Sequence, residues 1–167
     1  NATANSRYFG RGKGLTSSTW TSSQFSQYGT KIVPTSVRDA TYVLDEILGN
    51  ETELSIVEHT TDTAGYTDLV FALFDLLDMR FSPRIRDLGD QRLYRMDQTI
   101  RYQNLDPLMK TKINQELILQ HWDDMLRVAG SLKSGWVTAS LFISKLQAPP
   151  RKNALARALQ EYGRLVK

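Results

Sequence analysis

Alternating helix-type and strand-type patterns between residues 36 and 86 constrain the fold of this chain most strongly. Ser36 is a good helix N-cap, and apolar residues at helical spacing follow it. The extended segment 54–59 comes next, then a second apolar stripe that Thr67 can cap, then a short extended segment, 80–85. This order predicts an α/β unit with right-handed crossovers and a parallel pair of strands.

The segments before this unit carry weaker signals. Residues 1–30 are rich in Gly, Ser and Thr and are predicted to form loop or irregular strand. Residues 31–33 are predicted to form a short strand that Pro34 ends. Gly49 is predicted to end the first helix in the left-handed conformation. Three aromatic side chains are expected to anchor the N-terminal region: Trp20, Phe25 and Tyr28.

Beyond about residue 105 the pattern is helical. Asp106 and Pro107 are typical of a helix N-cap and first helical position. Two more helices are predicted near 136–147 and 153–167, the second capped by Asn153. One apolar face is predicted to contain Leu117, Ile118, Trp122, Met125, Leu126 and Ala129.

Composition narrows the class of protein. With 167 residues and 41% hydrophobic side chains, the chain suits one globular core. The absence of an apolar run near 20 residues argues against a membrane span. Cysteine is absent, which excludes disulfides and thiolate metal sites and favours an intracellular protein.

The net charge is only +3, but the charged residues are unevenly distributed along the chain. Residues 1–35 hold four basic residues and no acid, residues 36–79 hold ten acids and only Arg38, and residues 80–167 hold sixteen basic and eight acidic residues. Basic flanks around an acidic centre fit a protein that binds phosphates at its edges and a cation in the middle. On charge alone, solvated surface faces are the simpler explanation of the same blocks.

Asp62 is the main candidate for chemistry. It directly follows the predicted strand 54–59, and ligands of open α/β sheets bind beyond the carboxyl ends of strands. A carboxylate there can hold Mg²⁺, although a two-metal site needs several acidic groups. On spacing alone, Asp62 could equally cap its own turn. His59, three residues earlier, has no zinc-type partner spacing and is taken as structural.

Two basic segments could bind phosphate. Residues 7–14 interleave Arg7, Arg11 and Lys13 with glycines and aromatics, which would suit phosphate contacts or base stacking. A flexible terminal loop is the alternative. Arg84 and Arg86 are expected on one side of an extended segment, where they could hold phosphates or form surface ion pairs.

Several longer blocks of the sequence resemble a known protein family. Residues 58–68 (EHTTDTAGYTD) and 81–88 (FSPRIRDL) closely resemble the catalytic domain of class II replicative transposases, the Tn-three family. Four further blocks resemble that family in the expected order, at residues 5–10, 40–45, 121–123 and 153–156. Asp78, where a glycine is expected, and Pro149 depart from the pattern, and both concern turns.

The resemblance implies a ribonuclease H-like fold with an Asp-Asp-Glu set that binds two Mg²⁺ ions. Asp62 would be the second aspartate, with the first before Asn1 and the glutamate beyond Lys167. The expected fold class is α/β, a partial ribonuclease H-like core of helix-strand-helix-strand followed by a mostly α-helical insertion. The expected domains are 1–104, the core, and 105–167, the insertion, which would continue beyond the C-terminus.

Roles for other residues follow from the same resemblance. Residues expected to support Asp62 are His59, Thr63, Gly65 and Thr67. Residues expected along the DNA backbone are Arg7, Arg11, Lys13, Arg84 and Arg86. Nothing in the 153–167 segment replaces the absent glutamate convincingly, since Glu161 is its only acid.

The functional expectation concerns a longer parent protein. It would be a bacterial, cytoplasmic transposase that cleaves transposon ends and joins them to target DNA, giving a cointegrate. The isolated chain, with one of three carboxylates, is expected to cut no DNA. Loss of the opening strand would expose a sheet edge, so a homodimer is an open expectation. The alternatives are a non-catalytic DNA-binding or interaction module derived from a transposase, and a small phosphate-binding domain that uses residues 7–14.

Overall fold

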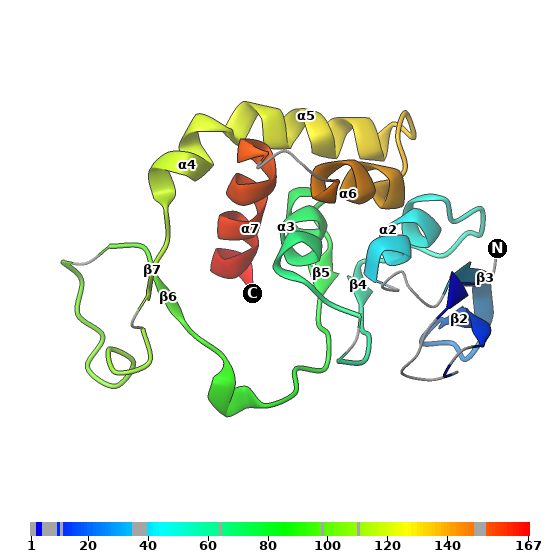
Figure 1. Cartoon of the computed structure of the whole chain (residues 1–167), viewed down its shortest axis with the longest axis horizontal. Coiled ribbons are helices and arrows are strands. Elements are labelled where there is room, and N and C mark those ends of the chain that lie inside the picture. Colours follow the sequence, from blue (N-terminus) through cyan, green and yellow to red (C-terminus); the bar gives the residue numbers. More distant parts are fainter. Residues whose placement is uncertain are drawn as a thin grey trace.

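A computed structural model shows a mixed α/β protein. The residues that it describes are 3–4, 10, 12–34, 40–63, 65–97, 99–109, 111–148 and 153–167. Among them are six α-helices and three small sheets (Figure 1). Ser36, the expected cap of the first helix, lies outside the described residues.

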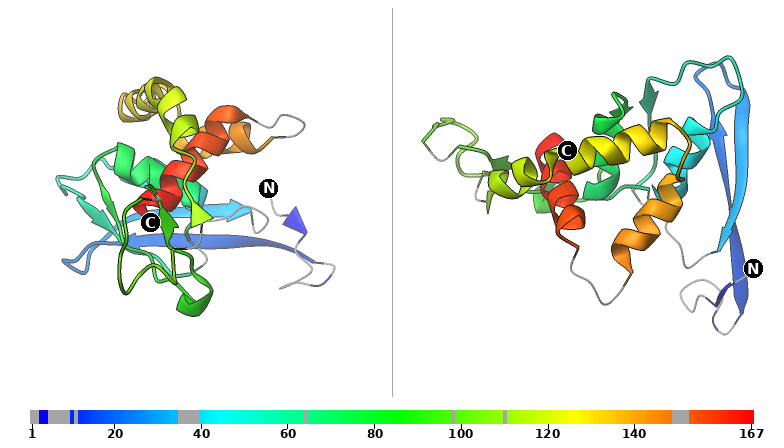
Figure 2. Two further views of the ribbon diagram at one scale, coloured as in Figure 1. Left: turned by 90° about the vertical axis from the view of Figure 1, so that its left-hand side faces the viewer. Right: turned by 90° about the horizontal axis from the view of Figure 1, so that it is seen from above.

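The N-terminal region is dominated by a long antiparallel hairpin. β1 (Thr3–Ala4), β2 (Lys13–Thr21) and β3 (Gln27–Pro34) form a sheet in that order, and the hairpin runs along one edge of the molecule (Figure 2). Of the two expectations for residues 1–30, loop or irregular strand, the loop is wrong for β2 and the start of β3, which are strands with a register irregularity at Trp20 and Thr21. The more buried positions of β2 alternate as in any half-buried strand, but Thr16 and Ser18 occupy two of them, so no apolar alternation marks the strand.

The hairpin turn corrects one expected anchor. The Ser22 amide donates to the Ser26 carbonyl (2.8 Å), and Phe25 adopts φ 62° with its side chain 95% exposed. Phe25 therefore anchors nothing among the described residues. Trp20 is buried as expected, and Tyr28 is half-buried.

The predicted helix-strand-helix-strand order is confirmed. It consists of α2 (Ala40–Leu48), β4 (Glu58–His59), α3 (Asp68–Leu76) and β5 (Arg80–Phe81), and β4 and β5 pair in parallel. The regular strands are shorter than predicted, yet hydrogen bonds extend the pairing. Backbone amides of Arg80, Ser82 and Arg84 donate to the carbonyls of Val57, His59 and Thr61 at 2.9, 2.9 and 2.8 Å.

Two predicted helix ends are corrected. Gly49 follows α2 but does not adopt the left-handed conformation. Asp106 does not begin a helix, because its carboxylate accepts hydrogen bonds from the Arg95 side chain and the Tyr102 amide within a turn. The segment between β5 and the next helix contains a 3-10 turn, η1 (Leu88–Asp90), and the parallel strands β6 (Tyr94–Arg95) and β7 (Thr111–Lys112).

The rest of the described chain is helical. It contains α4 (Gln115–Gln120), α5 (Trp122–Lys133), α6 (Ala139–Gln147) and α7 (Ala154–Val166). Asn153 caps α7 as predicted, since its side chain accepts from the Leu155 amide at 2.9 Å. Leu126, expected on the apolar face, is instead 46% exposed.

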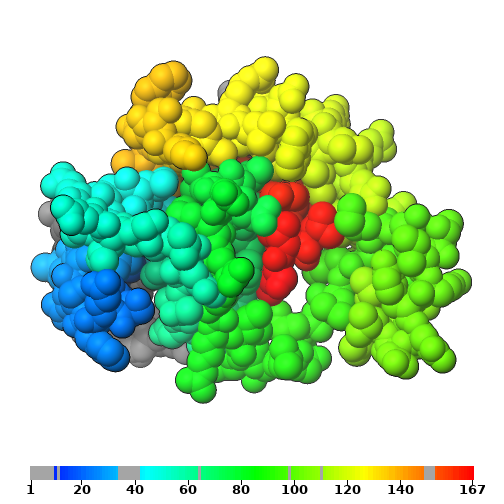
Figure 3. All heavy atoms as spheres, turned by 180° about the vertical axis from the view of Figure 1, so that it is seen from behind, coloured from blue at the N-terminus to red at the C-terminus, as the bar shows by residue number. Residues whose placement is uncertain are grey.

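One hydrophobic core joins these elements, with α3 at its centre. Leu69 to Phe74 are six consecutive buried residues, so α3 is enclosed on all sides. Figure 3 shows α7, in red, with green segments on both sides of it. Within the described part of the chain, the β2–β3 hairpin and the β4–β5 pair are separate sheets, so a complete ribonuclease H-like arrangement stays a prediction.

Candidate active site

Asp62 lies at the carboxyl end of the extended β4 segment. The last pairing bond of that segment joins Thr61 to Arg84, one residue before Asp62. The Asp62 side chain is exposed, so it does not point into the packed interior. A carboxylate in this position can reach a cation held beyond the strand ends.

A tight turn fixes the backbone after Asp62. The Gly65 amide donates to the Asp62 carbonyl at 3.2 Å, and Gly65 is buried. A Cβ added at Gly65 would lie 2.2 Å from Oγ1 of Thr61, far inside contact distance. The turn therefore needs glycine because the Thr61 side chain occupies that space. Thr63, within the turn, is half-buried.

The turn leads directly into the central helix. Thr67 is the N-cap of α3, as predicted, and its side chain accepts from the Val70 amide at 3.3 Å. This cap therefore joins the Asp62 turn to a helix whose residues Leu69 to Phe74 are all buried in the core.

His59 packs as a structural residue. Its ring stacks on Phe74 and Phe81, with centroid distances of 6.0 and 6.2 Å. Burial lowers the pKa of His59 from its ordinary value, so the ring is neutral near pH 7. Phe74 and Phe81 stack on each other at 4.4 Å, so His59 lies beside this phenyl pair, a place that suits packing better than metal binding.

Acidic side chains near the turn have other partners. Glu58 accepts from the Ser82 hydroxyl at 2.6 Å, and Asp68 lies 3.3 Å from Arg164. Glu161 accepts from the Asn114 amide at 2.9 Å and pairs with Arg164, so it does not replace an absent catalytic glutamate. Among the described residues no three His, Cys, Asp or Glu side chains form a metal-binding group. Asp62 thus fits one ligand of a hard cation, not a complete set.

Three of the expected DNA-contacting residues are described. Lys13, at the start of β2, and Arg84 and Arg86, after β5, are all exposed. Within the described part of the chain neither arginine forms an ion pair, so both guanidinium groups face solvent. Arg7 and Arg11 lie outside the described residues.

Comparison with known families assigns the chain. The family described as the Tn3 transposase DDE domain matches residues 1–167. The chain belongs to this Tn3 transposase family. Within the part of this Tn3-family domain that the structure describes, every helix is too short or too polar to span a bilayer.

Curated relatives agree with the family assignment. The domain is 48% identical over 160 residues to the transposase for transposon Tn1546 of Enterococcus faecium, which covers 96% of the chain and 16% of the relative. It is 49% identical over 157 residues to the transposase for Tn21 of Escherichia coli, covering 94% and 16%. The transposase for transposon gamma-delta of Escherichia coli K12 is 40% identical over 167 residues, covering 100% and 17%. No solved structure matches the chain significantly.

Sequence reasoning missed one part of this region. Arg164 and Lys167, on α7, contact Asp68, which follows the Asp62 turn. These residues are about one hundred positions apart in the sequence, and no motif links them. Only the packing of α7 on α3 reveals the connection.

Proposed function

We propose that this Tn3-family domain is part of a longer transposase, in which Asp62 is the second carboxylate of an Asp-Asp-Glu set. The parent enzyme would cleave transposon ends and transfer them to target DNA by a replicative route that gives a cointegrate. The observation that carries the proposal is the exposed Asp62 directly after the parallel β4–β5 pairing, in a chain that matches the DDE domain throughout.

The chemistry proposed for Asp62 is metal-dependent phosphoryl transfer. Two Mg²⁺ ions bound by the complete set would activate the attacking oxygen and stabilise the leaving oxygen. Asp62 would supply one hard oxygen ligand from a fixed backbone. Gly65 and Thr67 would keep that backbone in place, and His59, kept neutral by burial, would add no positive charge beside the cation.

The proposed substrate contacts are electrostatic. Arg84 and Arg86, which follow the strand next to Asp62, are exposed and form no ion pair with the described residues, and Lys13 is exposed on β2. Guanidinium groups bind phosphate oxygens well, so we propose that these side chains, with Arg7 and Arg11, lie along the DNA backbone. Thr63 would support the turn.

The division of the chain and its assembly stay predictions. We propose 1–104 as the partial ribonuclease H-like core and 105–167 as the helical insertion, with the β6–β7 pair and the shared core joining the two parts. A homodimer and a bacterial cytoplasmic location also belong to the proposal. With one carboxylate of three, the isolated 167-residue chain would nick no end-sequence DNA in Mg²⁺ or Mn²⁺.

The test is end cleavage by the full-length transposase that carries these residues. Asp62→Asn removes the charged ligand and should abolish nearly all Mg²⁺-dependent cleavage. Glu58→Gln is the matched control, because Glu58 is an exposed acid on the same strand that is held by Ser82 and Arg80. Full cleavage by Asp62→Asn would contradict the proposal and favour a non-catalytic DNA-binding or interaction module.

A further inference from the structure

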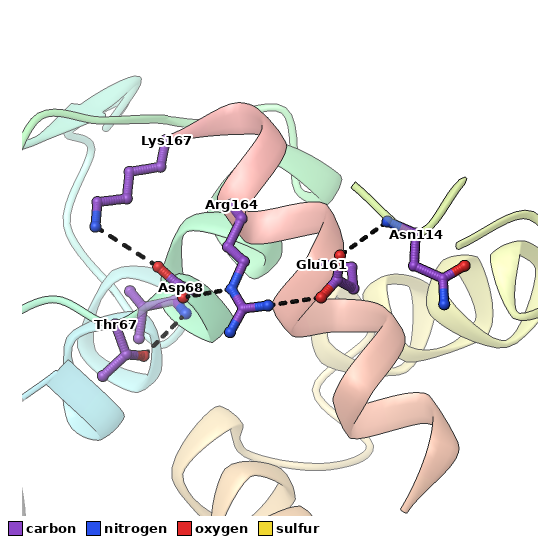
Figure 4. A network of polar contacts seen from close by, with 7 residues as sticks. Thr67, Asp68, Asn114, Glu161, Arg164 and Lys167 are labelled. Atoms are coloured by element: carbon purple, nitrogen blue, oxygen red, sulfur yellow. Dashed lines mark hydrogen bonds and ion pairs between the residues drawn. The ribbon is translucent and has the colours of Figure 1, made fainter. Parts of the chain in front are cut away.

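A network of charged side chains connects α7 to the start of α3 (Figure 4). Arg164 lies between two carboxylates, with Nε 3.3 Å from Oδ2 of Asp68 and Nη1 2.6 Å from Oε1 of Glu161. Lys167 adds a second cation 3.7 Å from Oδ1 of Asp68. The other Glu161 oxygen accepts the Asn114 amide at 2.9 Å. The network thus joins α3, α7 and the residue before α4.

These side chains are more enclosed than ordinary surface ion pairs. The side chains of Arg164, Asp68 and Glu161 are 35%, 29% and 18% exposed. Arg164 also lies over the ring of Tyr94, 5.7 Å from its centroid. Partial burial reduces screening, and the contacts to several groups hold the guanidinium in one orientation.

The two helix backbones approach each other closely at this network. A Cβ added at Gly163 would lie 1.7 Å from the Asp68 carbonyl oxygen. About two turns further along α3, the Tyr162 hydroxyl donates to the Asp75 carboxylate. The last turns of α7 are therefore held against α3 by backbone contact and by side chains on both sides.

The same end of α7 reaches the turn that carries Asp62. Nζ of Lys167 lies 5.2 Å from the ring centroid of Tyr66, one residue before the N-cap of α3. Tyr66 in turn packs edge-on against Phe71 of the core, at 5.9 Å. Lys167 and Arg164 thus contact the residues that immediately follow the Gly65 turn.

We propose that Arg164 and Lys167 are positioning residues for Asp62, acting through Asp68 and Tyr66. They hold the first turn of α3 and the Tyr66 ring. They thereby fix the direction in which the chain passes from the Asp62 turn into α3. They also neutralise Asp68, the nearest carboxylate after that turn, and so keep it from competing for the cation. The consequence for metal binding rests on the proposed role of Asp62 as a ligand.

The experiment compares Arg164→Met and Lys167→Met with Arg127→Met in the full-length transposase. Arg127 is a matched control because it forms an ion pair of similar geometry, 2.8 Å from Asp124 and three residues away on α5. Two quantities are measured: hydrogen exchange of the Gly65 amide, which reports the turn, and the Mg²⁺ concentration that gives half-maximal end cleavage. Arg164→Lys, which keeps the charge, is the conservative variant.

We expect both α7 variants to speed Gly65 exchange and to raise the half-maximal Mg²⁺ concentration by about tenfold, as for other residues that orient metal ligands. Arg127→Met should change neither, and Arg164→Lys should restore part of the Mg²⁺ affinity. A general loss of stability would instead lower cleavage at every Mg²⁺ concentration.

Two results separate the possible failures. Unchanged Gly65 exchange and an unchanged Mg²⁺ requirement in both α7 variants would overturn the positioning role. Faster exchange without any change in Mg²⁺ requirement would overturn its link to metal binding. Failure of the proposed function itself would appear independently, as full cleavage by Asp62→Asn.

Discussion

At the scale of single residues, the Asp62 turn depends on the space between Gly65 and Thr61. Adding a methyl group at Gly65 would overlap Oγ1 and Cγ2 of Thr61, at 2.2 and 2.7 Å. Gly65→Ala should therefore lower the free energy of unfolding by about 1–3 kcal/mol, measured by urea denaturation.

The double variant gives the control for this clash. Thr61→Ala removes both overlapping atoms, so Thr61→Ala/Gly65→Ala should recover most of the loss, a coupling of about 1 kcal/mol or more. Additive losses in the double variant would show that Gly65 is needed for another reason.

His59 makes stability depend on pH in a defined direction. Burial lowers its folded-state pKa below the ordinary value of 6.5, so the unfolded state binds protons more readily as the pH falls. The contribution of His59 to the free energy of unfolding is therefore lost as the pH falls below about 6.5, and it does not change above that pH. Urea denaturation of His59→Phe, which keeps a ring beside the stacked Phe74 and Phe81, should show a shallower loss of stability between pH 7 and 5. An equal slope in both proteins would contradict the packing described for His59.

At the scale of elements, α7 and α5 offer a matched pair of glycines. A Cβ at Gly163 would meet the Asp68 carbonyl at 1.7 Å, whereas nothing lies within 4 Å of a Cβ at Gly130 on α5. Gly163→Ala should lower the free energy of unfolding by at least about 2 kcal/mol, because the backbone of α7 must move away from α3. Gly130→Ala should raise it by about 0.5–1 kcal/mol through helix propensity. Thermal or urea unfolding distinguishes them, and equal effects would contradict the close contact of α7 and α3.

Elements with an apolar pattern could be predicted from the sequence, and those held by polar contacts could not. The α2 and α3 stripes and the parallel β4–β5 pair were visible because burial follows their spacing. For the β2–β3 hairpin only a loop or irregular strand and the short strand 31–33 were predicted, because Thr and Ser fill the half-buried positions of β2. Asp106 resembled a helix cap but binds Arg95, a partner that local sequence does not reveal.

The candidate site likewise has features that the sequence predicts and features that it does not. The order of residues placed Asp62 after a strand, and the cap at Thr67 could be recognised from its residue type. The resemblance also marked Asp78 as a site where glycine is expected, and Asp78 adopts φ 59° there. Contacts between α7 and α3 depend on the packing of distant segments, so neither spacing nor motif indicated Arg164 or Lys167.

At the scale of the whole molecule, the distribution of charge predicts how DNA binding depends on salt. Each phosphate contact contributes about 0.9 to the slope of log affinity against log salt concentration. Arg84→Gln and Arg86→Gln in the full-length transposase should therefore each reduce that slope by about 1, measured by fluorescence anisotropy. Arg127→Gln, whose partner is Asp124, should leave the slope unchanged. Unchanged slopes in all three would remove Arg84 and Arg86 from the proposed DNA contact.

The central claim, that Asp62 holds a catalytic cation beyond the β4–β5 pair, is tested most directly by locating that cation. Mn²⁺ can replace Mg²⁺ in crystals of the full-length transposase bound to transposon-end DNA, and its anomalous scattering marks its position. We predict a peak about 2 Å from a carboxylate oxygen of Asp62, close to the Mg²⁺–oxygen distance. Mn²⁺ bound in a cleavage-competent complex without contact to Asp62 would contradict the claim.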